Sequence, residues 1–174
     1  MGLAGLVLVA TYTPIVTRRP LLCLLAPGSG FAPVMVLGTS FALGGGYSWA
    51  ALAASLPPLF LVSGLLLINQ FPDIDADRRI GRRNLPIAMG RRRSAVAFDV
   101  LVFAAFLSMA AAAAIGLLSP WSLLGLTGLP VGAFLAQRVY LYADDLPRLV
   151  PSLGINVAMI HASLLLFGLG LLWR

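Results

Sequence analysis

Long apolar tracts alternate with short polar breaks along the chain. Six tracts carry few charged residues, and they cover residues 2–16, 21–45, 49–71, 94–118, 121–142 and 151–173. A helix needs about 20 mostly apolar residues to cross a bilayer. The tracts lack the ten-residue alternation of a membrane β-barrel, and backbone groups within lipid must be satisfied internally, so we predict helices. The pattern predicts an all-α bundle of about six transmembrane helices in a single domain, residues 1–174.

The composition agrees with a membrane protein. Hydrophobic residues make up 60% of the chain and charged residues 10%, and the mean hydropathy is +0.96. Soluble domains are typically about 25% charged. A soluble fold with this composition would expose large apolar patches, so we exclude a soluble domain.

The positive charge comes entirely from arginine, and its placement predicts an orientation. Twelve arginines face six aspartates, which gives a net charge of +6. With six spans, eleven arginines fall on one side and only Arg174 on the other. The positive-inside rule then places the arginine side in the cytoplasm and the C-terminus outside, in a bacterial or archaeal plasma membrane. Because the arginines flank spans, we interpret them as topology signals plus an anionic-substrate site, and expect no nucleic-acid partner.

The charge is densest in a predicted cytoplasmic loop, residues 72–93, that follows the third tract. Asn69, Asp73 and Asp77 stand four residues apart, so on a helix they share one face. Asp75 points about 200° away from Asp73 on the same helix. Pro72 cannot donate a helical hydrogen bond. The helix therefore either kinks there or stops just before, with a second helix starting at Pro72.

This pattern predicts a metal and diphosphate site. Carboxylate and amide oxygens are ligands that Mg²⁺ prefers, together with phosphate oxygens from a substrate, and the planar guanidinium group of arginine matches phosphate oxygens in pairs. The predicted metal ligands are Asn69, Asp73 and Asp77. The predicted diphosphate-binding residues are Arg78, Arg82 and Arg83. The weaker candidates are Asp75, Arg79 and His161.

A structural interpretation of the same residues stays open. Aspartates and arginines in a cytoplasmic loop can simply pair with one another, and such surface pairs contribute about 0–1 kcal/mol. The arginines at 91–93 fit a positive anchor for the next helix. His161 lies in the middle of the last tract, where a histidine is either functional or a hydrogen-bonded packing residue.

The stretch NQFPDIDADRRIGRRNLPIAMG, residues 69–90, resembles the second aspartate-rich motif of the UbiA-type intramembrane aromatic prenyltransferases. That motif reads N-x-x-x-D-x-x-x-D, followed by basic residues, glycine, threonine or asparagine, leucine and a further glycine. The matching positions are Asn69, Asp73, Asp77, Arg78, Gly81, Arg82, Arg83, Asn84, Leu85 and Gly90. Residues 12–14 and 30–49 are more weakly similar, so the resemblance covers helices four to nine of a nine-helix fold.

The resemblance implies transfer of a polyprenyl group from polyprenyl diphosphate to an aromatic small molecule, with Mg²⁺ as cofactor and membrane lipid as surroundings. The stretch is more similar to the 1,4-dihydroxy-2-naphthoate branch, which serves menaquinone synthesis, than to the 4-hydroxybenzoate branch. The family also carries a first aspartate-rich motif after its second helix, and no second motif occurs here. We expect a partial sequence that lacks activity alone. An inactive relative and a second chain that supplies the motif are the alternatives.

Two other classes compete with this interpretation. One is a non-catalytic membrane protein or accessory subunit whose basic loop binds anionic lipid. The other is a Mg²⁺-dependent CDP-alcohol phosphotransferase, which would require a D-G-x-x-A-R motif that is absent from the chain.

Overall fold

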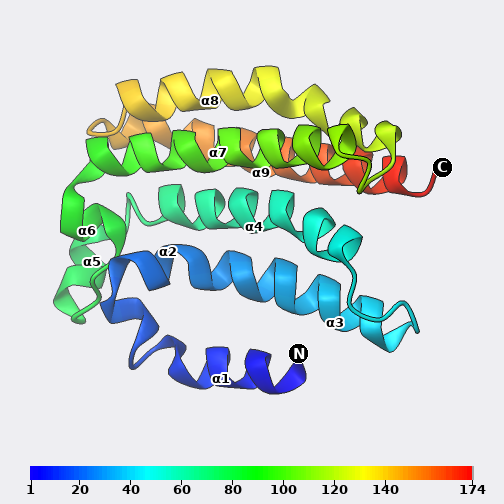
Figure 1. Cartoon of the computed structure of the whole chain (residues 1–174). Helices are drawn as coiled ribbons and strands as arrows, with labels where there is room; N and C mark the ends of the chain where they lie inside the picture. The colour runs from blue at the N-terminus through cyan, green and yellow to red at the C-terminus, as the bar shows by residue number, and fades with distance from the viewer. Residues whose placement is uncertain (174) are drawn as a thin grey trace.

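The computed structural model describes residues 1–173, and within that range the chain is built from helices joined by short turns, without a strand. The long helices lie roughly parallel to one another, and the chain reverses direction at each end of the bundle (Figure 1). The longer elements are α1 (Gly2–Tyr12), α2 (Pro20–Ser29), α3 (Met35–Ala42), α4 (Trp49–Asn69), α7 (Arg91–Ala114), η3 (Pro120–Gly128), α8 (Leu129–Leu141) and α9 (Leu146–Leu171). The short elements are η1 (Val16–Arg18), η2 (Gly30–Val34), α5 (Ile74–Arg79) and α6 (Leu85–Met89).

Four helices are long and apolar enough to cross a membrane: Pro20–Ala42, Trp49–Asn69, Arg91–Ala114 and Leu146–Leu171. This confirms the predicted all-α membrane bundle. The other two predicted tracts differ from single spanning helices. One is α1, with 11 residues, and the other is divided between η3 and α8. Two helices begin earlier than predicted. Helix α7 begins at Arg91 and α9 at Leu146, whereas the corresponding tracts were predicted to start at residues 94 and 151.

The division of residues 120–141 has a packing explanation. The segment Pro120–Gly128 is a 3₁₀-helix, in which residues three apart lie above one another. Ser122, Gly125 and Gly128 have this spacing, and all three are buried. A Cβ atom at Gly125 would meet Phe167 and the Ser163 carbonyl of α9. The period of three therefore places Ser122, Gly125 and Gly128 in one line against α9. With the 3.6-residue period of an α-helix, these small residues would be rotated progressively away from α9.

The second tract forms one continuous span with an irregular middle. Pro33 has no N–H to donate to the preceding turn, and the residues Gly30–Val34 around it form a π-helical turn between α2 and α3. Proline and glycine within membrane helices are tolerated where local π adjustments satisfy the backbone. The predicted irregularity is thus accommodated without breaking the span.

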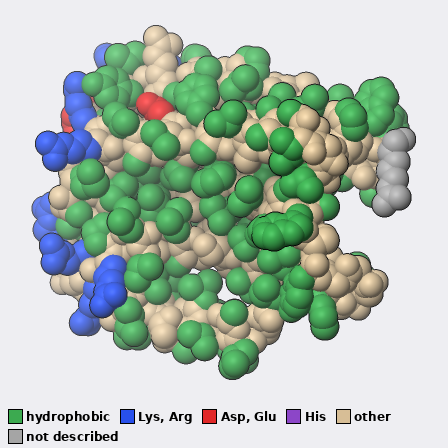
Figure 2. Space-filling view, viewed as in Figure 1, with side chains coloured by type: hydrophobic (Ala, Val, Ile, Leu, Met, Phe, Trp, Pro, Cys, Tyr) green, Lys and Arg blue, Asp and Glu red, His purple; other side chains and the backbone are tan. Residues whose placement is uncertain are grey.

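The two ends of the bundle differ in charge. Basic side chains gather at one end of the face shown in Figure 2, at the turns between α1 and α2, α4 and α7, and α8 and α9. The eleven described arginines are Arg18, Arg19, Arg78, Arg79, Arg82, Arg83, Arg91, Arg92, Arg93, Arg138 and Arg148. The tryptophans lie at the opposite end, where the rings of Trp121 and Trp173 meet edge to face with centroids 5.8 Å apart. This distribution matches the one-sided arginine pattern expected from the sequence.

Helix α4 lies at the centre of the packing and leads into the charged region. It packs against α2, α7 and α9, and Leu61, Leu67 and Ile68 on it are almost fully buried. The predicted loop 72–93 proved to be structured: it holds α5, α6 and the first turn of α7. Gly81 and Gly90 separate these helices with φ angles of 79° and 82°, a left-handed conformation that glycine adopts without strain. These glycines let the chain turn sharply after α5 and α6, so that two short helices fit into the segment predicted as a loop.

Candidate functional site

The aspartate-rich stretch is built from two helices rather than one. Helix α4 ends at Asn69, and α5 begins at Ile74 with Asp73 as its N-cap residue. The Asp77 N–H donates to the Asp73 carbonyl at 2.8 Å, which places these two residues one helical turn apart. Asn69 therefore belongs to the end of α4 and the two aspartates to α5. Pro72, which cannot donate to the α4 ladder, lies in the turn between the helices and is not the first residue of α5.

Asp77 is the buried member of the group. It is 6% exposed, and each of its carboxylate oxygens has a donor. Arg82 Nη1 donates to Oδ1 at 2.9 Å, and Asn84 Nδ2 donates to Oδ2 at 2.7 Å. Buried carboxylates require such partners. Arg82, predicted to bind diphosphate, is thus an ion-pair partner of Asp77 in this structure, although its side chain is 43% exposed.

Asn84 holds the second half of the stretch in place, a role that the sequence prediction did not assign. Its side chain accepts a hydrogen bond from the Ile87 N–H at 3.1 Å and so caps α6. The neighbouring Arg83 N–H donates to the Thr17 carbonyl at 2.8 Å, which ties this segment to the turn between α1 and α2. The signal was present in the sequence, because an asparagine followed by proline at the second position is typical of a helix start.

The remaining predicted ligands are exposed. Asn69 and Asp73 lie at the surface, and among residues 1–173 the Asp73 carboxylate makes no hydrogen bond or ion pair, although its backbone carbonyl accepts from the Asp77 N–H. Asp75 points away from them and lies 3.7 Å from Arg78 Nη1. Its carbonyl accepts a bond from Arg79 Nε at 3.2 Å. Both contacts of Asp75 are therefore with arginines of its own helix, α5.

The residues present fit a hard divalent cation in donor chemistry. Asp73, Asn69 and Asp77 offer oxygen atoms only, which suits Mg²⁺ bound through one or two carboxylates and phosphate. The described residues contain no group of three or more acidic, histidine or cysteine side chains that could hold a metal by themselves. These three residues would supply only part of the coordination shell of a cation, and in this structure Arg82 Nη1 donates to Asp77 Oδ1.

An apolar cavity of about 680 Å³ opens beside this region, between α1, η2 and α4. Tyr12 and Thr13 line the cavity at the end of α1, shortly before Thr17, whose carbonyl accepts from the Arg83 N–H of the charged stretch at 2.8 Å. Helix α1 has no buried residue. The cavity therefore has an apolar body suited to a hydrocarbon chain, with the hydroxyl groups of Tyr12 and Thr13 at the end of α1 that leads toward the charged stretch.

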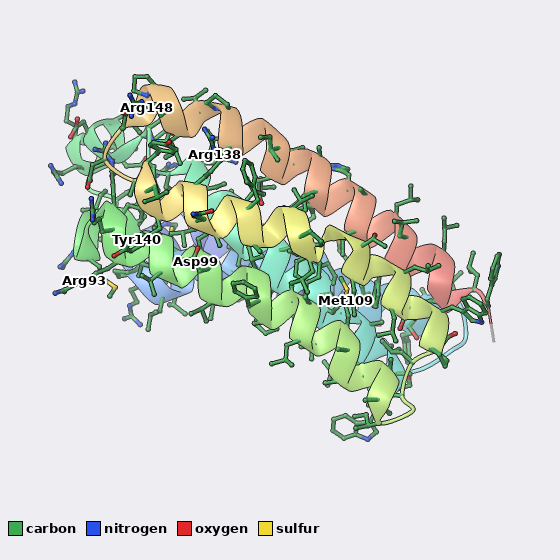
Figure 3. The ribbon with its side chains drawn as sticks, turned by 90° about the horizontal axis from the view of Figure 1, so that it is seen from above. Arg93, Asp99, Met109, Arg138, Tyr140 and Arg148 are labelled. Carbon is green, nitrogen blue, oxygen red and sulfur yellow. The ribbon has the colours of Figure 1, made fainter. Side chains whose placement is uncertain are left out.

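The other acidic residues do not join the site. Arg92 pairs with Asp144 and Arg148 with Asp145, each at 3.3 Å. Asp99 lies on α7 beside α8, on a second apolar cavity of about 690 Å³ (Figure 3). His161 is exposed on α9, and its Nδ1 lies 2.8 Å from the Val157 carbonyl.

Comparison with known proteins gives one match. The model of the UbiA prenyltransferase family matches residues 1–164. No curated protein and no solved structure matches the chain.

Proposed function

The chain belongs to the UbiA prenyltransferase family, and from this premise we propose that it contributes to Mg²⁺-dependent transfer of a polyprenyl group from its diphosphate to an aromatic acceptor. The observation that carries the proposal is the arrangement of Asp73 and Asp77 one turn apart on α5, with Arg82 and Arg83 next to them.

Each part of the proposed site has a separate task. Asp73, Asp77 and Asn69 would hold Mg²⁺, which neutralises charge on the diphosphate when it is bound. Arg78, Arg82 and Arg83 would bind phosphate oxygens through their guanidinium groups. The bond between the allylic carbon and the diphosphate oxygen breaks, and its electron pair leaves with the diphosphate. A ring carbon of the acceptor then forms the new bond and the ring loses a proton.

The apolar cavity supports the binding of a lipid substrate. It lies next to the charged stretch, and its lining is almost entirely hydrocarbon from α1, α2, η2 and α4. An allylic cation survives only where water is excluded. We propose that the polyprenyl chain occupies this cavity, with its diphosphate end toward Asp73 and Arg82.

We also propose that a second aspartate-rich motif completes the site, because the six acids in these 174 residues supply one such motif. The purified 174-residue chain is expected to give no prenylated product from polyprenyl diphosphate, an aromatic acid and Mg²⁺. Product should appear when a family segment carrying N-x-x-x-D-x-x-x-D is joined to it, and EDTA should abolish the product. Efficient turnover by the chain alone would contradict the partial site, whereas a completed enzyme without any Mg²⁺-dependent product would refute the proposed reaction.

The acceptor is proposed to be 1,4-dihydroxy-2-naphthoate. In the completed enzyme, this compound and 4-hydroxybenzoate can be offered in parallel and the products separated by mass. Exclusive prenylation of 4-hydroxybenzoate would exclude the proposed branch.

The arginine-rich end is proposed to face the cytoplasm, with the C-terminus outside. An alkaline phosphatase fused after Arg174 in a bacterial host should therefore be active, and a green fluorescent protein fused there should stay dark. The opposite pair of signals would invert the orientation.

A further inference from the structure

Two of the hydrogen bonds in the candidate site come from one buried side chain. Asn84 is 1% exposed. Its Oδ1 accepts from the Ile87 N–H at 3.1 Å, and its Nδ2 donates to Asp77 Oδ2 at 2.7 Å. An N–H can only face an acceptor, so the bond from Ile87 fixes which side of the amide is oxygen and leaves the NH₂ group toward Asp77. Asn84 thus connects the start of α6 to a carboxylate on α5.

The two oxygens of Asp77 are held very differently. The donor to Oδ2 is the fully enclosed Asn84, whose position is also fixed by its bond to α6. The donor to Oδ1 is Arg82, whose side chain is 43% exposed. Arg82 can turn toward an incoming phosphate when a cation takes its place on Oδ1, because the cation then balances the buried carboxylate. The enclosed Asn84 amide stays on Oδ2. Oδ1 is therefore the exchangeable oxygen of Asp77, and Oδ2 the fixed one.

We propose that Asn84 is a positioning residue, which holds Asp77 so that Oδ1 stays aimed at the metal–diphosphate ligand when Arg82 moves away. The inference rests on the proposed function, in which Asp77 is a ligand of a divalent cation. Groups that orient metal ligands typically change metal affinity by about 10–100-fold when they are removed. Removal of the Asn84 amide should therefore weaken metal binding to a similar degree, although Asn84 itself does not contact the metal.

Segments on both sides keep the arrangement rigid. The Arg82 N–H donates to the Asp77 carbonyl at 3.0 Å, and the Arg83 N–H to the Thr17 carbonyl at 2.8 Å. Arg91 Nη2 donates to the Phe71 carbonyl at 3.3 Å, which fixes the turn before α5 to the start of α7. With the backbone held at these points, the Asn84 amide is the contact that sets the rotation of the Asp77 carboxylate.

The test separates positioning from helix capping. Serine is also a good N-cap residue, but its hydroxyl is too short to reach Asp77 from this position. Asn84→Ser therefore keeps the cap and loses the bond to Asp77, whereas Asn84→Ala loses both. Ser48→Ala removes a cap of the same kind from α4, at the opposite end of the bundle.

The probe is Mn²⁺ with inorganic diphosphate, and free Mn²⁺ is measured by electron paramagnetic resonance on the full chain in nanodiscs. Thermal unfolding of each variant is recorded in parallel.

We expect Asn84→Ser and Asn84→Ala to weaken Mn²⁺ binding equally, by about 10–100-fold. Both variants leave Asp77 Oδ2 without its buried donor and lower the unfolding temperature, but Asn84→Ala also loses the cap of α6 and should lower it further. Ser48→Ala should lower the unfolding temperature and bind Mn²⁺ like the wild type. Wild-type binding in Asn84→Ser would overturn the inference and leave the proposed function intact. Wild-type binding that is insensitive to Asp77→Asn would remove the metal site of the proposed function, and the inference with it.

Discussion

Replacing Asp73 with alanine is expected to reduce prenyl transfer by a completed enzyme by at least about 10²–10³-fold, the loss typical of a removed charge-stabilising group. Asp73 is exposed, and within residues 1–173 its only hydrogen bond is accepted by its backbone carbonyl, which alanine keeps, so removing the carboxylate should leave the fold unchanged and act on the metal and diphosphate alone. Asp77→Ala should lose activity as fully, but also costs stability, because the donor on the buried Asn84 is left unpaired at about 1–3 kcal/mol. Turnover and thermal unfolding of the purified variants measure the two effects.

Asp75→Ala is the matched control for these variants. Asp75 lies on the same short helix, two residues from each of the others, but is exposed and paired with Arg78. We expect its activity to stay within about threefold of the wild type, because an exposed pair contributes about 0–1 kcal/mol. Equal losses at positions 73, 75 and 77 would contradict a site on one face of α5.

Gly170→Ala is expected to destabilise the bundle by about 3 kcal/mol or more, the upper range for overpacking. Gly170 is buried on α9, and a Cβ atom there would overlap the backbone carbonyl of Trp121. A backbone group cannot turn away as a flexible side chain can, so α9 and η3 would have to separate. Unfolding in a denaturing detergent series, followed by circular dichroism, measures the change in free energy.

Gly168→Ala provides the control in the same helix. A Cβ atom at Gly168 would meet nothing within 4 Å. Alanine favours a helix over glycine by about 1 kcal/mol, so this variant should be as stable as the wild type or slightly more stable. Similar destabilisation by both variants would mean that the close contact between α9 and η3 does not form.

The sequence predicted the helical bundle well because hydropathy reflects the lipid environment directly. It predicted the 3₁₀ segment Pro120–Gly128 poorly, because that geometry depends on which helix lies opposite. Only the packing of Gly125 against α9 shows why the small residues need a period of three. The start of α9 was also predicted too late, because the predicted tract began at Pro151. In the structure α9 begins at Leu146, and Pro151 lies within the helix.

The site was predictable in composition and less so in contacts. The spacing of Asp73 and Asp77 correctly placed them one turn apart on α5. It did not show that Asp77 is buried or that Arg82 and Asn84 occupy its two oxygens. These contacts depend on the turn at Gly81, which lies between Asp77 and its two partners and has a positive φ angle. The residue roles in metal and diphosphate binding stay predictions.

The most direct measurement of the central claim detects diphosphate and metal together at α5. Mn²⁺ and inorganic diphosphate are added to the chain in nanodiscs, and electron–nuclear double resonance records the coupling between bound Mn²⁺ and ³¹P. Our account predicts a protein-bound signal with ³¹P coupling in the wild type and in Asp75→Ala, and loss of that signal in Asp73→Ala and Asp77→Asn. A wild-type signal that persists in both of the latter variants would contradict a metal–diphosphate site at Asp73 and Asp77.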